Sequence, residues 1–270
     1  MPGKPQLIVF TDLDGTLLDQ ETYSWEAARP GLEALRSQNV PLILSSSKTR
    51  EELAPIRRDL ESPHPFIVEN GGAVYIPEIY FTVPLPDTRT MKGYLRIELG
   101  VPYSLLRRAL ASIRRETGIA LLGYGDLDLS EIRRLTGLPE DEARRSQARE
   151  YDEPFLIEAP ATEHQTVLDR IHAMGFQWTK GGRFYHLSGK HDKGVAVRIL
   201  SDLYGKQHGA VRTVALGDSA NDLPMLLAVD EAVIVQRPDG SYLETDLKTA
   251  RRTDGIGPVG WNEAILSLLK

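Results

Sequence analysis

The sequence predicts an α/β protein, in which a doubly wound, Rossmann-like parallel sheet carries an inserted α+β domain. Short, continuous apolar runs, typical of strands buried on both faces, lie near both ends of the chain and alternate with helical periodicity. Between these two regions the pattern of predicted elements changes, with longer helical stretches and residues typical of a hairpin. A length of 270 residues fits two domains or one domain with an insertion.

The predicted sheet is built from both ends of the chain. Its N-terminal part has expected strands at 7–10, 41–44 and 66–68 and expected helices at 25–38 and 49–60. Its C-terminal part has expected strands at 211–216 and 232–235 and expected helices at 191–204, 223–228 and 261–270. The expected helix at 191–204 ends because Gly205 follows it. Strands and helices that alternate in this way pair in parallel through right-handed crossovers.

Residues 85–187 form the predicted insertion, so the core consists of 1–84 and 188–270. A linker containing two prolines, at 83–87, marks its start. Its expected elements are helices at 104–116, 128–136, 139–149 and 163–174 and strands at 155–157, 176–180 and 183–187. The Gly181-Gly182 pair fits a tight turn, which predicts a hairpin of the last two strands.

Composition excludes several classes of protein. The 32 basic and 38 acidic residues give a net charge of −6, which argues against nucleic acid or an anionic membrane as the main partner. The absence of cysteine excludes disulfides and cysteine-ligated metals. No apolar run approaches the ~18–20 residues of a membrane span, so a cytoplasmic protein is expected. Small anionic substrates remain allowed, and nothing in the sequence predicts an oligomeric state.

Two aspartates directly follow the first predicted strand. Asp12 and Asp14 lie in the segment Thr11-Asp12-Leu13-Asp14-Gly15-Thr16, at the carboxyl end of the strand, where doubly wound sheets bind ligands. Residues two apart on extended backbone project to the same side, so both carboxylates are expected to face one crevice. The alternative is that one aspartate caps a turn and the other is solvated.

Further polar groups occur at other strand ends and at one helix start. Residues 45–49, a run of serines with Lys48 and Thr49, follow the second strand, where they can bind an anion or simply cap the next helix. Asp218 follows a C-terminal strand, and Asp222 is placed to cap a helix. Lys193 opens a helix although a cation opposes the helix dipole there, which indicates a nearby anion.

In a parallel sheet these groups converge on one crevice. They supply paired carboxylates, a third acid, a hydroxyl and a lysine. Phosphoryl transfer needs Mg²⁺ held by carboxylates, donors for the phosphoryl oxygens and an in-line nucleophile. The sequence therefore predicts a magnesium-dependent phosphoryl-transfer enzyme with a small phosphorylated substrate.

With these motifs the sequence resembles the haloacid dehalogenase superfamily of phosphohydrolases. Its four signatures occur in order along nearly the whole chain: Asp12-x-Asp14-x-Thr16, Ser46, Lys193 and Gly217-Asp218-x-x-Asn221-Asp222. The insertion between the second and third resembles the large α+β cap of the superfamily's sugar phosphatases. The resemblance implies a phosphomonoester hydrolase with a haloacid dehalogenase-like core and a substrate-selecting cap.

Three further strings are similar to those of mannosyl-3-phosphoglycerate phosphatases. They are Ser46-Ser47-Lys48-Thr49-Arg50, Glu69-Asn70-Gly71-Gly72 and Glu150-Tyr151-Asp152-Glu153-Pro154-Phe155. Other sugar phosphatases usually carry Thr-Gly-Arg where this chain has Ser46-Ser47-Lys48, so a generic hexose phosphate is disfavoured. The similarity implies hydrolysis of mannosyl-3-phosphoglycerate to phosphate and mannosylglycerate, a compatible solute. Glucosyl-3-phosphoglycerate, sucrose-phosphate and a phosphomutase reaction stay open as alternatives.

The resemblance also implies the catalytic roles. Asp12 is the nucleophile that forms an aspartyl-phosphate. Asp14 protonates the leaving oxygen and then takes a proton from the hydrolytic water. Mg²⁺ is held by Asp12, by Asp218 and by the backbone carbonyl of Asp14.

Binding roles follow from the same resemblance. The phosphoryl group is bound by Ser46, Ser47, Lys193 and Asn221. Asp222 orients Lys193 or a metal-bound water. In the cap, a glycerate carboxylate needs a cation, and the predicted substrate-binding segment is Lys180, Gly181, Gly182 and Arg183. A solvated basic turn is the alternative for this segment.

Other functional classes lack their motifs. A dinucleotide oxidoreductase needs Gly-x-Gly-x-x-Gly after the first strand, and Gly123-Tyr124-Gly125 lacks the third glycine. A P-loop hydrolase needs a glycine where Phe184 precedes Gly189-Lys190. The histidines show no zinc spacing, and a glycosidase has no need for a lysine and a third acid. A non-catalytic phosphate sensor resembling a receiver domain needs neither Asp14 nor a cap.

Overall fold

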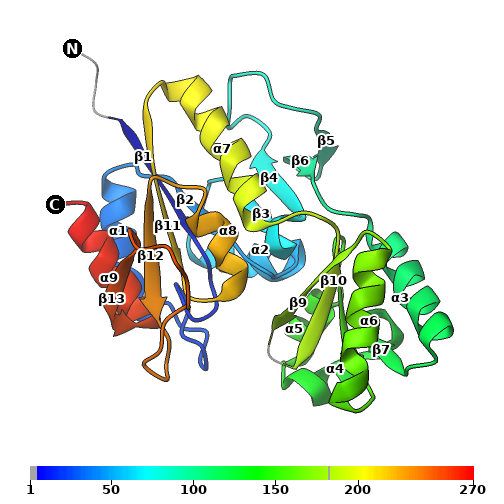
Figure 1. Ribbon diagram of the computed structural model, residues 1–270. Coiled ribbons are helices and arrows are strands. Elements are labelled where there is room, and N and C mark those ends of the chain that lie inside the picture. The colour runs from blue at the N-terminus through cyan, green and yellow to red at the C-terminus, as the bar shows by residue number, and fades with distance from the viewer. Residues whose placement is uncertain (1–4, 182) are drawn as a thin grey trace. The chain divides into compact units, whose positions relative to one another are not determined.

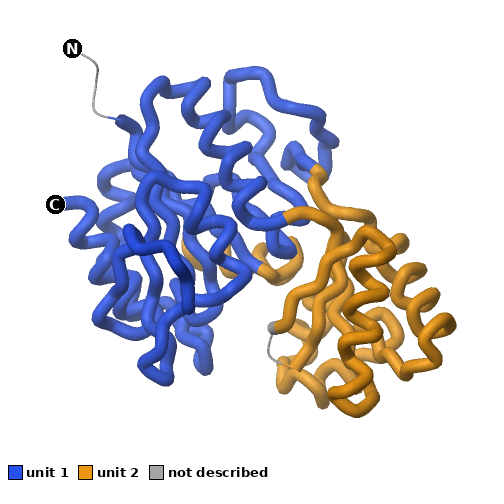
Figure 2. Tube along the Cα trace, in the orientation of Figure 1, with its two compact units in different colours: residues 1–46, 62–97, 192–270 blue, residues 47–61, 98–191 orange. Residues whose placement is uncertain are grey.

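The computed structural model describes residues 5–181 and 183–270, which form two compact units (Figure 2). Of the described residues, the larger unit contains 5–46, 62–97 and 192–270. The smaller unit contains 47–61, 98–181 and 183–191. Each unit is described in turn.

The larger unit is built on a mixed sheet of nine strands in the described chain (Figure 1). Its strands are β1 (Gln6–Thr11), β2 (Leu42–Ser45), β3 (Phe66–Val68), β4 (Ala73–Pro77), β5 (Arg89–Met91), β6 (Tyr94–Glu98), β11 (Val211–Gly217), β12 (Glu231–Gln236) and β13 (Arg251–Ile256). They lie in the order β13-β12-β11-β1-β2-β3-β4-β6-β5. The six strands from β13 to β3 run parallel, whereas β4 pairs with β3 in the antiparallel sense. This confirms the predicted α/β class and the parallel core.

Helices cover both faces of this sheet. They are α1 (Arg29–Ser37), α7 (Lys193–His208), α8 (Leu223–Leu226) and α9 (Gly257–Leu268), with 3₁₀ turns η1 (Glu26–Ala28), η2 (Glu69–Gly71) and η4 (Ala220–Asp222). Figure 1 shows α1 and α9 on one side of the central strands and α7 and α8 on the other, which is the doubly wound arrangement.

The central strands are apolar because they are covered on both faces. Ile8, Val9 and Phe10 of β1 are fully buried. Helix α9 contributes Trp261, which is fully buried, and α1 approaches it at Gly31, where an added Cβ would lie 3.1 Å from the indole. Glycine at this position therefore lets the two helices pack closely.

The smaller unit is an α+β domain with an antiparallel sheet in the order β7-β8-β10-β9. Its strands are β7 (Leu121–Gly123), β8 (Asp152–Ile157), β9 (Gln177–Gly181) and β10 (Phe184–Ser188). Its helices are α2 (Arg50–Asp59), α3 (Tyr103–Thr117), α4 (Leu129–Thr136), α5 (Glu140–Ser146) and α6 (Ala161–Ala173), with the 3₁₀ turn η3 (Tyr124–Asp126). Helices α3 and α6 pack with Phe155 and Leu187 of the sheet in its main apolar core.

The structure departs from the sequence predictions at several elements. Strands β4, β5, β6, β7 and β13 were not predicted, and α7 passes through Gly205 to His208, so the predicted stop at Gly205 is wrong. The smaller unit begins at residue 98 rather than 85, because β5 and β6 extend the large sheet. It also includes residues 47–61. The functional division into core and cap stays a prediction.

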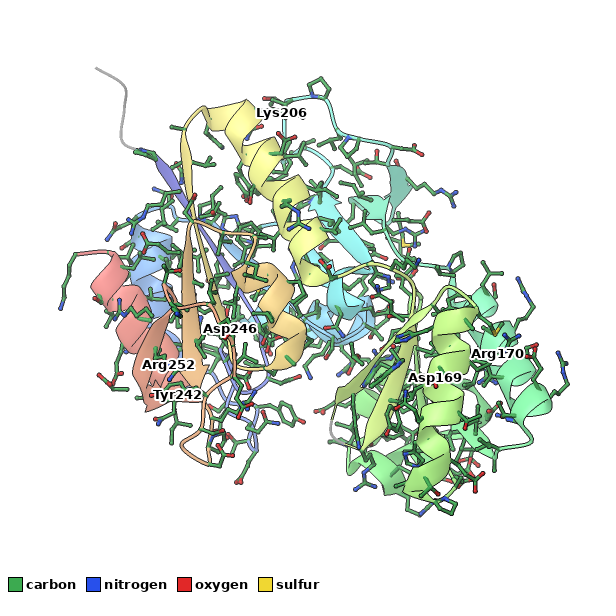
Figure 3. The ribbon with its side chains drawn as sticks, viewed as in Figure 1. Asp169, Arg170, Lys206, Tyr242, Asp246 and Arg252 are labelled. Atoms are coloured by element: carbon green, nitrogen blue, oxygen red, sulfur yellow. The ribbon has the colours of Figure 1, made fainter. Side chains whose placement is uncertain are left out.

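Surface charges form local pairs in each unit, and Figure 3 labels three of the cations involved, Lys206, Arg252 and Arg170. In the larger unit Lys206 lies 2.5 Å from Asp202, and the guanidinium of Arg252 lies over the ring of Tyr242. In the smaller unit Arg170 Nη2 lies 2.6 Å from Glu116 Oε2, and this ion pair links α6 to α3. Exposed pairs of this kind contribute little to stability.

Among the described helices, none has the length and apolar character needed to cross a membrane.

Candidate active site

The site lies where the order of the parallel strands reverses. β1 lies between β11 and β2, so the chain proceeds in opposite directions along the sheet on either side of β1 and β11. Thr11 at the end of β1 pairs with Leu216 in β11, and the N–H of Asp12 donates to the carbonyl of Leu216 at 3.0 Å. Asp12 and Asp218 therefore leave neighbouring strands at the same edge, which is where doubly wound sheets bind ligands.

A tight turn after Asp12 brings the first motif against Asp218. Gly15 has φ +79°, and an added Cβ there would lie 2.7 Å from Gln20 Oε1 and 3.2 Å from Asp218 Oδ2. Only glycine fits both this conformation and this close approach. The hydroxyl of Thr16 then donates to Asp218 Oδ1 at 3.0 Å. Two parts of the chain separated by about two hundred residues thus meet, as the sequence predicted.

Lys193 is the buried cation of the site. It begins α7, where Asp192 provides the N-cap by accepting from the N–H of Val195. Its Nζ donates to Asp12 Oδ1 at 2.5 Å and to Asp222 Oδ1 at 2.6 Å, and its side chain is fully buried. Burial alone lowers the pKa of Lys193, but the charges of Asp12 and Asp222 outweigh it and raise the pKa above its ordinary value.

Asp222 organises the loop after β11 rather than capping α8. Its Oδ2 accepts from the N–H groups of Asp218 and Ser219 at 3.1 and 3.0 Å, while its Oδ1 holds Lys193. Among the described residues no side-chain hydrogen bond caps α8, so Asp222 does not have the capping role considered for it there. At Gly217 an added Cβ would lie 2.5 Å from the Cβ of Asp222, so glycine is required for this packing.

Three carboxylates form a cluster that fits a divalent cation. Oxygens of Asp12, Asp218 and Asp222 lie within 4.8 Å of one another, in a group that is buried. An oxygen-only donor set suits hard ions such as Mg²⁺. Because both oxygens of Asp222 already accept hydrogen bonds, Asp12 and Asp218 are the better ligands of the three. The predicted ligand role of the Asp14 carbonyl stays a prediction.

The cluster is electrostatically costly without a cation. Burial and the neighbouring charge of Asp222 raise the pKa of Asp218 to about 6. Burial and the same neighbour also raise the pKa of Asp12 well above its usual range, although Lys193 acts in the opposite sense. A bound divalent cation would neutralise this crowded negative charge.

Ser46 and Asn221 meet through Asn70. Ser46 follows β2 and is almost fully buried, and its carbonyl accepts from the N–H of Asn70 at 2.9 Å. Asn221 Nδ2 donates to Asn70 Oδ1 at 3.0 Å. Capping of α2 is performed by Thr49, whose hydroxyl accepts from the N–H of Glu52, rather than by the serines.

Four further predicted residues, Ser47, Lys180, Gly181 and Arg183, lie in the smaller unit. The carbonyl of Ser47 accepts from Arg149 Nη1 at 2.9 Å. Lys180 Nζ lies over the ring of Tyr185, 5.1 Å from its centre, and Arg183 is exposed. Gly181 ends β9, and Gly182 lies outside the described residues. The roles predicted for these residues stay predictions.

Residues that sequence reasoning missed complete the site. Thr16 belonged to a recognised motif, but its contact with Asp218 was not foreseen. Arg237 Nε donates to the carbonyl of Asp218 at 2.9 Å, from the loop after β12, and carries no motif signal. Asn70 lies in the segment 69–72, which resembles a segment of known phosphatases but predicts no role for this residue. Only its contacts in the folded chain, with Ser46 and Asn221, indicate a role.

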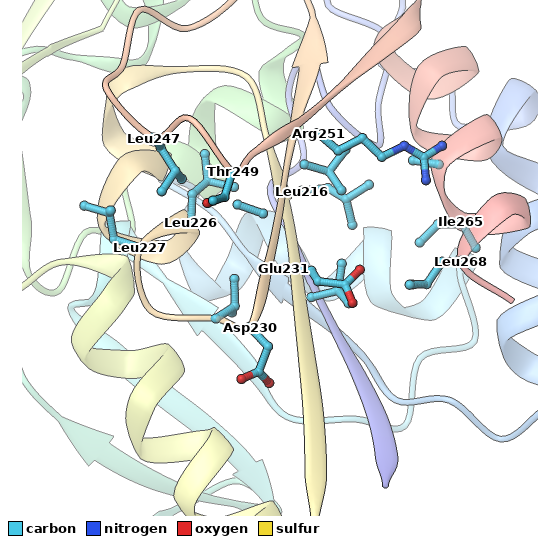
Figure 4. A pocket seen from close by; sticks show the side chains of 15 residues that line it. Leu216, Leu226, Leu227, Asp230, Glu231, Leu247, Thr249, Arg251, Ile265 and Leu268 are labelled. Atoms are coloured by element: carbon cyan, nitrogen blue, oxygen red, sulfur yellow. The ribbon is translucent and has the colours of Figure 1, made fainter. Parts of the chain in front are cut away.

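A separate pocket of the larger unit lies away from these residues (Figure 4). Leu226, Leu247 and Ile265 contribute to its mainly apolar lining, and Asp230 and Glu231 place it at the amino end of β12. The site described above lies at the opposite, carboxyl edge of the parallel strands. None of the described residues that line the pocket was predicted to act in the site.

Comparison with known proteins identifies relatives along nearly the whole chain. The family model of haloacid dehalogenase-like hydrolases matches residues 9–93. A glucosyl-3-phosphoglycerate/mannosyl-3-phosphoglycerate phosphatase from Methanococcoides burtonii is 48% identical over 263 residues, which cover 97% of each chain. A mannosyl-3-phosphoglycerate phosphatase from Pyrococcus furiosus is 38% identical over 229 residues, 84% of this chain and 90% of its own.

A solved structure shares the fold. A haloacid dehalogenase-like hydrolase from Bacteroides thetaiotaomicron superposes with a TM-score of 0.66 at 20% identity, covering 98% of this chain and all of that one. Likeness at this level of identity concerns the fold alone. It agrees with the doubly wound sheet and the α+β unit described above.

Proposed function

Because the chain belongs to the haloacid dehalogenase-like phosphatases, we propose that it hydrolyses the phosphate ester of mannosyl-3-phosphoglycerate, glucosyl-3-phosphoglycerate or both. The observation that carries this proposal is the 48% identity, over 97% of each chain, to a phosphatase named for these two substrates. The buried arrangement of Asp12, Lys193, Asp222 and Asp218 supports phosphoryl transfer chemistry. A cytoplasmic location stays a prediction.

Asp12 is the proposed nucleophile. One of its oxygens forms a bond to phosphorus while the bond from phosphorus to the ester oxygen breaks, which gives an aspartyl-phosphate and the free sugar-glycerate alcohol. Lys193 holds Asp12 Oδ1 at 2.5 Å and so fixes the orientation of the carboxylate before the reaction. Its charge also offsets the repulsion between Asp12 and an incoming phosphate dianion.

Asp14 is the proposed acid and base. It donates a proton to the leaving alcohol oxygen in the first half-reaction. In the second, it accepts a proton from the water that attacks the phosphorus of the aspartyl-phosphate, and the bond to Asp12 breaks. Inorganic phosphate leaves, and both aspartates return to their starting states.

The residues present fit Mg²⁺. Asp12 and Asp218, with the backbone carbonyl of Asp14, would hold it, and the bound ion supplies positive charge that stabilises the phosphoryl oxygens. Ser46, Asn221 and Lys193 are the proposed donors to the phosphoryl group. Thr16 and Arg237 support the ligand Asp218 through its Oδ1 and its carbonyl oxygen.

The test is a panel of phosphate-release assays. The substrates are mannosyl-3-phosphoglycerate, glucosyl-3-phosphoglycerate, sucrose-phosphate and hexose phosphates, each with Mg²⁺ and with EDTA. We expect release from the first two with Mg²⁺, little release from the others, and none from an Asp12→Asn variant. Release from sucrose-phosphate or hexose phosphates alone would replace the proposed substrate, and dependence on a sugar bisphosphate with no net release would indicate a mutase. A fully active Asp12→Asn variant would overturn the mechanism.

A further inference from the structure

The turn between β3 and β4 has an unusual backbone. Glu69, Asn70 and Gly71 have φ values of +47°, +56° and +96° in succession. Asparagine tolerates the left-handed region, but glutamate does so only at a cost. Glu69 is also fully buried. Strain of this kind persists only where the surroundings over-determine it, and it is concentrated at functional sites.

This turn contacts the three segments that carry the proposed phosphate-binding residues, which are two loops and the start of α7. The N–H of Asn70 donates to the carbonyl of Ser46 at 2.9 Å, and Asn70 Oδ1 accepts from Asn221 Nδ2 at 3.0 Å. Gly71 packs against the start of α7, where an added Cβ would lie 2.9 Å from the backbone nitrogen of Lys193 and 2.1 Å from the carbonyl oxygen of Asp192.

Hydrogen bonds continue from Asn70 toward the buried ammonium. The hydroxyl of Ser219 donates to Asn221 Oδ1 at 2.5 Å, and the N–H of Ser219 donates to Asp222 Oδ2 at 3.0 Å. Asp222 Oδ1 in turn holds Lys193. Asn70 is therefore the link between this network and the loop that carries Ser46.

The left-handed conformation explains why a single residue makes both contacts. Asn70 directs its N–H to Ser46 and its side-chain oxygen to Asn221 from the same turn. We propose that Asn70 is a positioning residue for phosphoryl transfer, which fixes the Ser46 loop against the Asn221 loop and so sets the spacing of the phosphate-binding groups. This inference rests on the proposed function and adds a residue to it.

The test variant is Asn70→Gly. Glycine adopts the same backbone conformation and keeps the N–H bond to Ser46, so only the side-chain bond to Asn221 is lost. We expect kcat with Mg²⁺ and mannosyl-3-phosphoglycerate or glucosyl-3-phosphoglycerate to fall about tenfold or more, with a smaller change in KM. Competitive inhibition by inorganic phosphate should weaken severalfold. The melting midpoint should stay within about 2 °C of the wild type.

The chain offers a matched control and an internal consistency check. Asn39 also has a positive φ, +53°, but is exposed and outside the site, so Asn39→Gly should change neither kcat nor phosphate inhibition. If Asn70 acts through Asn221, the kcat of the double variant Asn70→Gly/Asn221→Ala should lie within about twofold of the kcat of Asn221→Ala alone. A decrease in kcat equal to the product of the two single decreases would contradict a shared role.

The outcomes separate this inference from the proposed function. An active wild type together with an Asn70→Gly variant of equal kcat and equal phosphate inhibition overturns the positioning role and leaves the function intact. A wild type that releases no phosphate from any substrate overturns the function. The inference is then judged by calorimetric titration with inorganic phosphate and Mg²⁺, where equal binding by the variant and the wild type rejects it.

Discussion

At the scale of single residues, the ammonium of Lys193 balances the charge of two buried carboxylates. It donates to Asp12 and to Asp222, and all three side chains are buried. Lys193→Met keeps the length of the side chain but removes its charge. We expect kcat to fall by about 10²–10³-fold, because the reacting group loses its main cationic donor. We also expect a loss of about 3–5 kcal/mol in the free energy of unfolding, because two buried acids are left without their partner.

The control for this variant is Lys206→Met. Lys206 pairs with Asp202 at 2.5 Å, but both side chains are more than half exposed, so the substitution should change the free energy of unfolding by less than about 1 kcal/mol. Phosphate release measured in parallel with urea unfolding compares the two variants. Equal effects of the two substitutions would contradict the charge-balancing role of Lys193.

Motif residues could be predicted because their signal is local. Asp12 and Asp218 follow strands that their apolar runs reveal, and Lys193 stands at a helix start where a cation needs an explanation. Phosphate binding by Asn221 stays a prediction, whereas the hydrogen bond that its Nδ2 donates to Asn70 was not predicted. Contacts of that kind, and the bond from Arg237 to the carbonyl of Asp218, join segments far apart in the chain and have no local pattern.

At the scale of elements, α7 contains two glycines in opposite environments. An added Cβ at Gly194 would lie 2.3 Å from the carbonyl oxygen of Pro224, whereas at Gly205 the nearest atom is a Val211 methyl at 4.0 Å. We expect Gly194→Ala to destabilise the protein by about 1–3 kcal/mol and, by displacing the adjacent Lys193, to lower kcat about ten- to a hundredfold. Gly205→Ala should stabilise by up to about 1 kcal/mol with unchanged kcat. Thermal melting and phosphate release check both, and a neutral Gly194→Ala would contradict the close packing.

The start of α2 depends on a capping box. Thr49 accepts from the N–H of Glu52, and the Glu52 carboxylate accepts from the N–H of Thr49. The Thr49 hydroxyl also donates to the carbonyl of Arg145 at 2.9 Å. Thr49→Ala should therefore cost about 1–2 kcal/mol of unfolding free energy, somewhat more than Asp128→Ala at the exposed capping box of α4. Denaturant unfolding measures both, and a smaller loss at Thr49 than at Asp128 would refute the added contact.

Helices and strands could be predicted where their burial leaves a recognisable pattern of apolar residues in the sequence. The strands buried on both faces, such as 7–10 and 211–216, appeared as continuous apolar runs. β5 and β13 did not, because they lie at the two edges of the sheet and carry exposed, polar residues. Gly205 was read as a helix end, but α7 continues because the propensity cost of one interior glycine is small beside the burial of Leu203 and Tyr204.

At the scale of the whole molecule, the topology of the sheet determines where part of the negative charge is concentrated. A chain of net charge −6 places several of its acids at one edge of its central sheet. The order reversal at β1 and β11 makes this unavoidable, since each strand is followed directly by an aspartate that the proposed mechanism uses. Folding therefore crowds carboxylates at one site, and we expect metal binding, proton binding and stability to be linked there.

This linkage predicts how Mg²⁺ and pH act together. Burial and Asp222 raise the pKa of Asp218 to about 6 in the folded protein, above the ordinary 3.8. The folded state thus binds this proton more tightly than the unfolded chain does. Its contribution to the stability of the metal-free protein is largest below about pH 4, falls as the pH rises to about 6 and is constant above.

In the proposed mechanism Asp218 is a ligand of Mg²⁺, so Mg²⁺ competes with that proton for the Asp218 carboxylate. Its apparent dissociation constant should therefore rise up to about tenfold per pH unit below 6. We expect a saturating Mg²⁺ concentration, about a hundred times the dissociation constant at pH 7.5, to add about 2.7 kcal/mol to the unfolding free energy at that pH. The gain at pH 5 should be clearly smaller. Scanning calorimetry with Mg²⁺ and with EDTA at the two pH values measures the difference.

Asp218→Asn provides the decisive comparison, because the amide keeps the shape of the side chain and removes its charge. The metal-free variant should be more stable than the metal-free wild type at pH 7.5, since the crowding of Asp12, Asp218 and Asp222 is relieved. Mg²⁺ should stabilise the variant little at either pH, and phosphate release should be lost. An equal Mg²⁺ stabilisation of the wild type at pH 5 and pH 7.5, or an undiminished one in Asp218→Asn, would show that the ion binds elsewhere.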